Sequence, residues 1–120
     1  MIKISKRLST IANFIENSLF LVDCGCDHGK LSIYALLSNK TKFAYLLDLR
    51  EEPLNQAKFN VNKYNVKDNT KLVLSDGLKS FNEEFDTLVI SGMGSELIIK
   101  IINDSSRVFI YECKCKLIIR

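Results

Sequence analysis

The sequence predicts an α/β fold in which helices pack on a doubly wound parallel sheet. Apolar segments of strand length alternate with segments of helical periodicity along the 120 residues, an order typical of parallel sheets. The first two predicted strands each end in an acid, Asp23 and Asp48, and a glycine-containing turn at residues 25–29 follows the first. Because ligands of such folds bind at the carboxyl ends of the strands, we expect a site there.

Composition limits the class of protein. The chain is 47% hydrophobic and 26% charged with a formal net charge of +3, which is ordinary for one soluble domain spanning residues 1–120. No apolar run approaches the roughly 18 residues of a membrane span, and the N-terminus lacks the apolar segment of a signal peptide. We therefore expect a cytoplasmic protein without membrane contact. The positive charge fits either a polyanionic partner or a solvated lysine-rich surface.

The four cysteines form two Cys-x-Cys pairs, Cys24 with Cys26 and Cys113 with Cys115. Thiolates can hold zinc, but structural zinc sites usually have about two to four residues between paired ligands. A reducing cytosol disfavours a disulfide. We interpret the first pair as small buried side chains and predict no metal.

The first predicted helix covers residues 3–16, with Leu8, Ile11 and Ile15 on one face. It is expected to pack on the sheet. Lys6 and Arg7 lie at its start, where their charges could contact nucleic-acid phosphates. A solvated helix face remains the alternative for these two cations.

The stretch from Leu19 to Lys30 is the centre of the predicted site. A buried strand, rich in branched and aromatic residues, leads to Asp23, which stands two residues before Gly25 and six before Gly29. The glycines allow the backbone to approach a ligand. A helix continuing through Leu37 follows, and its N-terminus suits a carboxylate or phosphate.

The second predicted strand, residues 42–48, again ends in an acid. Asp48 at the tip of a neighbouring strand is placed to accept hydrogen bonds from both hydroxyls of a ribose. The alternative is that Asp48 caps the next helix, which begins near Glu51 and runs to about Tyr64.

The rest of the chain adds two more turns. The third predicted strand, 71–74, leads to Asp76 and Gly77, where the acid could bind the exocyclic amine of an adenine and Leu78 could cover the ring; a simple Asp-Gly turn is the alternative. The fourth strand, 86–90, leads to glycines around a methionine at 92–94. A helix at 96–102 and a fifth strand at 108–111 follow.

Five stretches in order carry a family resemblance: Ile4-Ser-Lys-Arg-Leu8, Asp23-Cys-Gly-Cys-Asp-His-Gly-Lys-Leu31, Asp48, Ser75-Asp-Gly-Leu78 and Ile90-Ser-Gly-Met-Gly-Ser95. They resemble the bacterial tRNA (adenine-22, N1)-methyltransferases of the TrmK family, class I enzymes that use S-adenosyl-L-methionine (SAM). The Asp27-His28 pair distinguishes this turn from other glycine-rich methyltransferase turns. The resemblance implies a Rossmann-like sheet, SAM as cofactor, tRNA as partner and methyl transfer to N1 of adenine 22.

The resemblance also implies roles for individual residues. Asp27 is the expected catalytic residue, because a carboxylate stabilises the charge that the methylated base gains. Cofactor contacts are expected from Asp23, Gly25, His28, Gly29, Asp48, Leu49, Asp76, Gly77 and Gly92. Substrate contacts are expected from Lys6, Arg7, Met93 and Gly94. His28 fits a structural hydrogen-bonding role equally well.

The resemblance runs from Lys3 to about Tyr111, whereas Glu112–Arg120 departs from the family pattern. The chain therefore looks like a truncated member that lacks the family's C-terminal helical tRNA-binding domain. Only about five of the usual strands are then expected, and an open edge at residues 108–110 could mediate self-association.

Two other functions remain open. The first is a non-catalytic SAM- or RNA-binding remnant of such an enzyme. The second is a nicotinamide-binding protein, whose usual turn would require glycine at positions 27 and 30, where Asp27 and Lys30 stand.

Overall fold

The computed structural model describes residues 2–90 and 116–119. In these ranges the helices are α1 (Lys6–Ala12), α2 (Lys30–Leu37), α3 (Glu51–Lys63) and the short 3₁₀ helix η1 (Lys67–Asn69). The strands are β1 (Ser18–Cys24), β2 (Thr41–Asp48), β3 (Thr70–Leu74), β4 (Thr87–Ile90) and β5 (Lys116–Ile119). The α/β fold predicted from the alternating pattern is confirmed.

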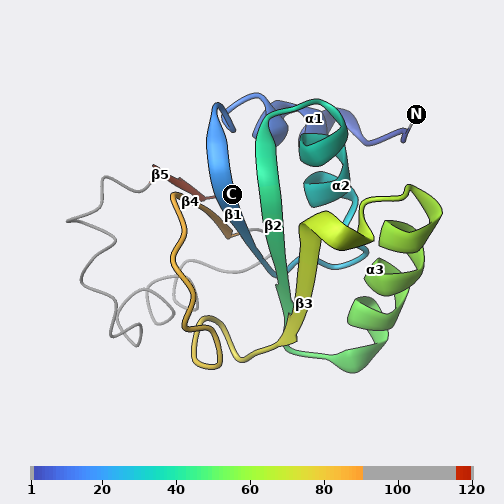
Figure 1. Ribbon diagram of the computed structural model, residues 1–120, viewed down its shortest axis with the longest axis vertical. Helices are drawn as coiled ribbons and strands as arrows, with labels where there is room; N and C mark the ends of the chain where they lie inside the picture. Colours follow the sequence, from blue (N-terminus) through green and yellow to red (C-terminus); the bar gives the residue numbers. More distant parts are fainter. Residues whose placement is uncertain (1, 91–115, 120) are drawn as a thin grey trace.

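The strands form one parallel sheet in the order β3-β2-β1-β4-β5 (Figure 1). The chain moves outward from β1 to β3 and then returns to β4 on the other side of β1. The register pairs Cys24 with Leu47 of β2 and with Ile90 of β4. The carboxyl ends of these three strands therefore lie at the same edge of the sheet.

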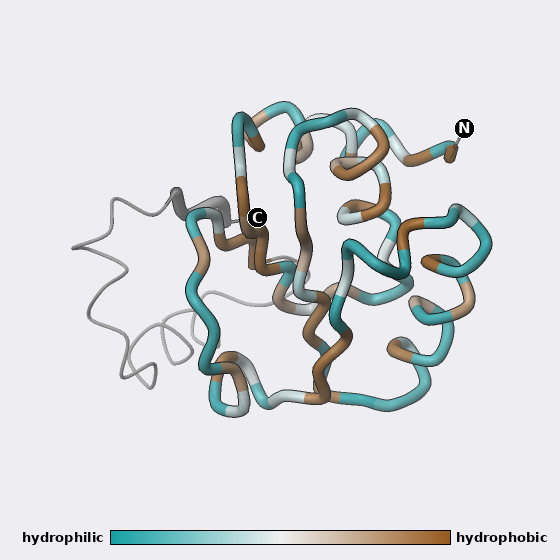
Figure 2. The backbone as a smooth tube through the Cα atoms, viewed as in Figure 1, coloured by the Kyte–Doolittle hydropathy of each residue, from teal (hydrophilic) through white to brown (hydrophobic). Residues whose placement is uncertain are grey.

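All three α-helices cover the same face of the sheet (Figure 1). Their apolar residues pack with every second residue of the strands, since neighbouring strand residues point to opposite faces. This core cluster includes Ile11 of α1, Ile33 of α2, Ala57 of α3 and the buried strand residues Leu21 and Leu46. Figure 2 shows hydrophobic residues along the strands and mostly hydrophilic residues in the loops.

The opposite face of the sheet is covered, within the described residues, by the segment 75–86. Leu78, Phe81 and Phe85 of this segment pack on Tyr45 and the other strand residues that face them. The rings of Tyr45 and Phe81 meet edge to face, with their centroids 4.8 Å apart. Leu78 is thus a core residue, which corrects the expectation that it covers a ligand ring.

Asp86 ties β1 to β4 at the opposite edge of the sheet. Its carboxylate accepts hydrogen bonds from the hydroxyls of Ser18 and Thr87 at 2.7 and 2.8 Å, and from the N–H groups of Leu19 and Phe20 at 2.7 and 3.1 Å. Partial burial opposes ionisation, but these four bonds outweigh it and lower the pKa of Asp86.

The first helix is shorter than predicted. It covers Lys6–Ala12 rather than 3–16, because Ser5 caps it by accepting a hydrogen bond from the Leu8 N–H at 3.2 Å. After Ala12 the chain leaves the helix in tight turns, and the Ile15 N–H donates to the Ala12 carbonyl. Ile15 is nevertheless fully buried. The apolar spacing that predicted the helix therefore includes a core residue that lies beyond the end of the helix.

The described fifth strand was not predicted. β5 comprises Lys116–Ile119 and pairs with β4; the strand predicted at residues 108–111 is a different segment. The predicted strand, the predicted helix at 96–102 and the residues Gly92, Met93 and Gly94 lie outside the described residues. In the part of the chain that is described, no helix has the length and apolar character needed to cross a membrane.

Candidate functional site

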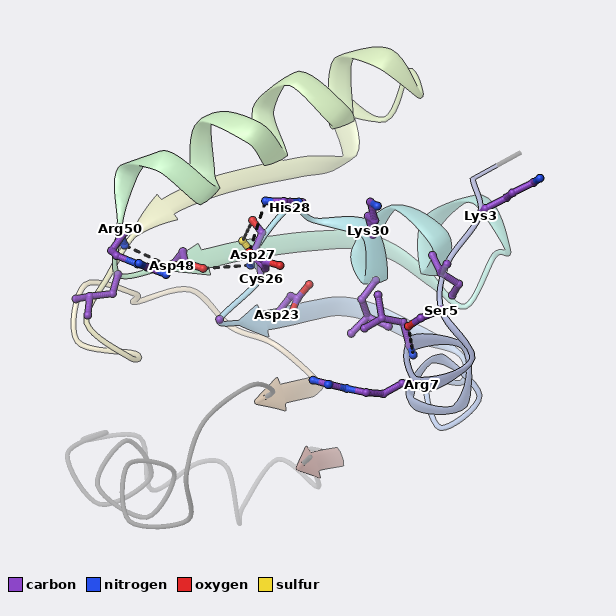
Figure 3. Close-up of a pocket in the computed structure, with 15 residues that line it drawn as sticks. Lys3, Ser5, Arg7, Asp23, Cys26, Asp27, His28, Lys30, Asp48 and Arg50 are labelled. Carbon is purple, nitrogen blue, oxygen red and sulfur yellow. Dashed lines mark hydrogen bonds and ion pairs between the residues drawn. The ribbon is translucent and has the colours of Figure 1, made fainter.

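A cavity of about 640 Å³ opens at the carboxyl ends of β1 and β2 (Figure 3). The turn after β1, the tip of β2 and the segment leading into α1 form its walls. The predicted site residues that line it are Arg7, Asp23, Gly25, Asp27, His28, Asp48 and Leu49. The fold thus brings together most of the described residues that the sequence singled out.

Backbone hydrogen bonds fix the turn after β1 against β2. The N–H groups of Gly25 and Cys26 both donate to the carbonyl of Leu47, each at 2.9 Å. Gly25 adopts a φ of 78°, and Asp27 adopts a φ of 53°, in the left-handed region that is easiest for glycine. The turn therefore follows a defined path in the wall of the cavity.

Asp48 connects the turn to the tip of β2. Its Oδ2 accepts a hydrogen bond from the Asp27 N–H at 3.1 Å, and its Oδ1 accepts one from the Arg50 N–H at 3.2 Å. The alternative role as a helix cap is wrong, because Arg50, not Asp48, is the N-cap residue of α3. A carboxylate has about four lone-pair positions, so Asp48 keeps acceptor capacity for a ligand.

Asp23 is the buried acid of the cavity wall, with 1% of its surface exposed. Its Oδ2 accepts a hydrogen bond from the Ser32 hydroxyl of α2 at 2.7 Å. Burial raises the pKa of Asp23 from 3.8 to about 6; the Ser32 bond opposes this shift, and the charges of Asp48 and Asp27 add to it. A positively charged ligand group nearby would favour the ionised form.

Asp27 and His28 lie at the exposed rim. Their side chains are 76% and 50% exposed, and Asp27 Oδ1 lies 3.7 Å from His28 Nε2. The carbonyl of His28 accepts a hydrogen bond from Asn60 Nδ2 of α3 at 2.9 Å. The backbone of His28 thus has a structural role in joining the turn to α3, while both side chains remain open to a ligand.

Gly29 has a packing role rather than a place in the cavity lining. It is the N-cap of α2 with a φ of 78°. A Cβ atom at this position would lie 2.8 Å from Leu46 Cδ2 and 3.2 Å from Ala57 Cβ. The close approach of α2 to β2 and α3 therefore requires glycine here.

The turn after β3 lies next to the cavity without lining it. The Ser75 N–H donates to the Asp48 carbonyl at 2.9 Å, and the Ser75 hydroxyl donates to the Gly77 carbonyl at 2.7 Å. The exposed carboxylate of Asp76 lies 3.4 Å from Lys79 Nζ. Among the predicted contacts, Lys6 is likewise exposed on α1 but absent from the lining.

Further residues line the cavity that were not predicted from the sequence. They include Lys3, Cys26 and Arg50. Arg50 follows the strand-tip acid by two residues, which was an available signal. Lys3 lies in the N-terminal segment, far in sequence from the strand tips, and no local pattern in the sequence indicates that it lines the cavity.

Cys24 and Cys26 are small buried side chains, as predicted. They belong to the core clusters on opposite faces of the sheet. Burial raises the pKa of the Cys24 thiol to about 12 and raises that of Cys26 further. Nowhere in the described ranges do three or more His, Cys, Asp or Glu side chains gather as a metal site.

Comparison with known families decides the class of protein. The family model described as a methyltransferase domain matches residues 4–119 of this chain. The chain belongs to this methyltransferase family. The match extends to residue 119, whereas the predicted resemblance to TrmK ends near Tyr111.

Relatives of this methyltransferase domain confirm the resemblance to TrmK. A tRNA (adenine(22)-N(1))-methyltransferase from Bacillus subtilis is 35% identical over 102 residues, covering 84% of this chain and 43% of the relative. The structure of M. capricolum TrmK with S-adenosyl-homocysteine is 38% identical with a TM-score of 0.81, over 87% of this chain and 48% of that one.

The structure of Streptococcus pneumoniae Sp1610 in complex with SAM is 33% identical with a TM-score of 0.80, over 85% of this chain and 49% of that chain. The methyltransferase domain described here therefore spans about half the length of these relatives.

Proposed function

We propose that this chain binds SAM in the cavity at the ends of β1 and β2 and transfers its methyl group to N1 of adenine 22 in tRNA. One observation carries the proposal. Asp48, at the tip of β2, is bonded to the glycine turn through the Asp27 N–H and keeps free acceptor capacity beside the cavity. Relatives of this chain hold SAM or its product.

The residues of the cavity fit the parts of this cofactor. Asp48 would accept hydrogen bonds from the ribose hydroxyls, and the buried carboxylate of Asp23 would attract the amino group. The first N–H groups of α2 have no partner within the helix and suit the carboxylate. Asp76 stands beyond Asp48 along the same sheet edge, where its carboxylate could accept a hydrogen bond from the adenine amine.

The chemistry requires little from the protein beyond alignment and charge. When bound, SAM supplies a methyl group whose bond to the sulfonium sulfur breaks as a bond to adenine N1 forms, giving S-adenosyl-homocysteine and a cationic 1-methyladenine. Neutral N1 carries a free lone pair, so no base is needed before attack. Asp27, exposed at the rim, would stabilise the positive charge that develops on the base.

The substrate must present an unpaired adenine. N1 lies on the edge that base pairing uses, so the target base has to leave its stack to reach the cavity. Arg7 lines the cavity and is exposed, which suits a contact with an RNA phosphate. Lys6, on the same helix, would contribute charge from outside the cavity.

A methylation assay tests the proposal. Purified protein would be incubated with methyl-labelled SAM and a tRNA transcript carrying either adenine or guanine at position 22. We expect label only in the adenine transcript. Asp27→Asn should lower the rate about 10²-fold with SAM affinity retained, whereas the exposed control Asp68→Asn should match wild type.

Two results would contradict the proposal. Equal labelling of the guanine transcript would place the methyl group on another base. SAM binding with no label in either transcript would instead support the non-catalytic remnant.

A further inference from the structure

A second groove, of about 510 Å³, lies between the N-terminal segment and α3. Its lining residues are Ile2, Lys3, His28, Lys30, Gln56, Phe59, Asn60, Lys63 and Tyr64. Lys3, His28 and Lys30 line the cofactor cavity as well. The groove is therefore continuous with the rim at which the proposed reaction takes place.

The groove carries one sign of charge. Lys3, Lys30 and Lys63 are exposed, and no carboxylate stands among the described residues that line it. The acids of α3, Glu51 and Glu52, lie in its first turn, at the opposite end from Lys63. Lysines that line one groove without paired acids attract a polyanion.

Two aromatic residues, Phe59 and Tyr64, line the groove together with these cations. Phe59 is 62% exposed, so its ring contributes little to the core. Lys63 Nζ lies 5.5 Å from the ring centroid of the half-buried Tyr64. Asn60, between them on α3, donates a hydrogen bond to the His28 carbonyl at 2.9 Å, which holds this wall of the groove to the turn of the cofactor site.

We propose that this lysine groove docks an RNA strand, with phosphates on Lys3, Lys30 and Lys63 and an unpaired base on Phe59. Cations that track a backbone, combined with exposed rings, are the features that bind single-stranded nucleic acid. An acidic protein would use the cations but not the ring. The inference rests on the proposed function, because the shared rim at His28 leads the strand towards the cofactor cavity.

Binding of labelled tRNA tests the groove. Lys63→Glu is paired with Lys58→Glu, which makes the same charge change on the same helix at an exposed residue outside the groove lining. Lys63→Glu should weaken binding about 10-fold and reduce the slope of log affinity against log salt by about 0.7 to 0.9. Lys58→Glu should have a much smaller effect.

Phe59→Ala separates stacking from charge. It should weaken tRNA binding about 10-fold while leaving the salt slope unchanged, because a base contact releases no counterions. Since Phe59 is mostly exposed, its truncation should leave the fold intact.

Three results would contradict the proposed RNA groove. The first is an equal loss of tRNA affinity in Lys63→Glu and Lys58→Glu, and the second is wild-type tRNA affinity in both Lys63→Glu and Phe59→Ala. The third is displacement of bound tRNA by poly-glutamate at equal charge concentration. SAM affinity measured on the same proteins separates the two proposals. If SAM binds and the groove variants behave like wild type, only the groove fails; if wild type does not bind SAM, the proposed function fails whatever the tRNA result.

Discussion

Asp23 lines the cavity, and its burial disfavours the charged form of its carboxyl group. Because burial raises its pKa to about 6, ionising this carboxyl near neutral pH costs the folded protein free energy. A bound ammonium group would offset that cost, so the residue favours ligand binding at the expense of the stability of the free protein.

Asp23→Asn tests this balance through pH. The folded pKa of about 6 lies above the ordinary 3.8, so the folded state binds more protons between these values and wild type loses stability as pH rises through that window. The loss amounts to at most about 3 kcal/mol at roughly 1.4 kcal/mol per pKa unit. Asp23→Asn should remove this loss and weaken SAM binding.

Urea unfolding at pH 4, 5 and 7 measures the difference between the two proteins. We expect the variant to gain stability relative to wild type as pH rises. Parallel stability curves would contradict the buried, costly carboxylate.

At the residue scale, the strand-tip acids were predictable and several of their neighbours were not. Asp23 and Asp48 could be placed because parallel strands end at one edge. Gly29 was expected to contact a ligand, but its contacts with Leu46 and Ala57 depend on how α3 packs. Such distant contacts leave no spacing pattern in one sequence.

At the scale of elements, the start of α2 depends on close packing. Gly29 lets the first turn of α2 approach Leu46 of β2 and Ala57 of α3. This approach sets the position of the turn that carries Asp27 and His28.

Gly29→Ala should therefore destabilise the fold by about 2 to 4 kcal/mol, since it adds a steric clash to an unfavourable φ. Gly77→Ala is the control, because Gly77 also has a positive φ, of 62°, and should lose only about 1 to 2 kcal/mol. Thermal unfolding of both variants measures the difference. Equal losses would mean that backbone strain alone explains the glycine at position 29.

Element boundaries were predicted less well than element types. The apolar spacing of residues 3–16 includes Ile15, which is buried although it lies outside the helix. The pattern of buried residues is therefore longer than the helix itself. The segment 116–119 is apolar but short, and only its pairing with β4 identifies it as a strand.

For the whole molecule, the strand order explains why the site lies where it does. The chain runs from β1 to β3 in one direction and resumes at β4 on the other side of β1. Connections on the two sides of such a reversal diverge and leave a crevice at the carboxyl ends. The cavity beside Asp23 and Asp48 occupies this edge, and the lysine groove continues from its rim.

Isothermal titration with SAM of wild type, Asp48→Ala and the exposed control Asp68→Ala tests the assignment of the cofactor site. Circular dichroism would confirm that each protein is folded. We predict one binding site in wild type and in the control, and at least about a 10-fold loss in Asp48→Ala, because charged hydrogen bonds contribute about 1.5 to 3 kcal/mol each. A folded wild type that does not bind SAM, or an Asp48→Ala variant that binds as well as wild type, would contradict the assignment of the site.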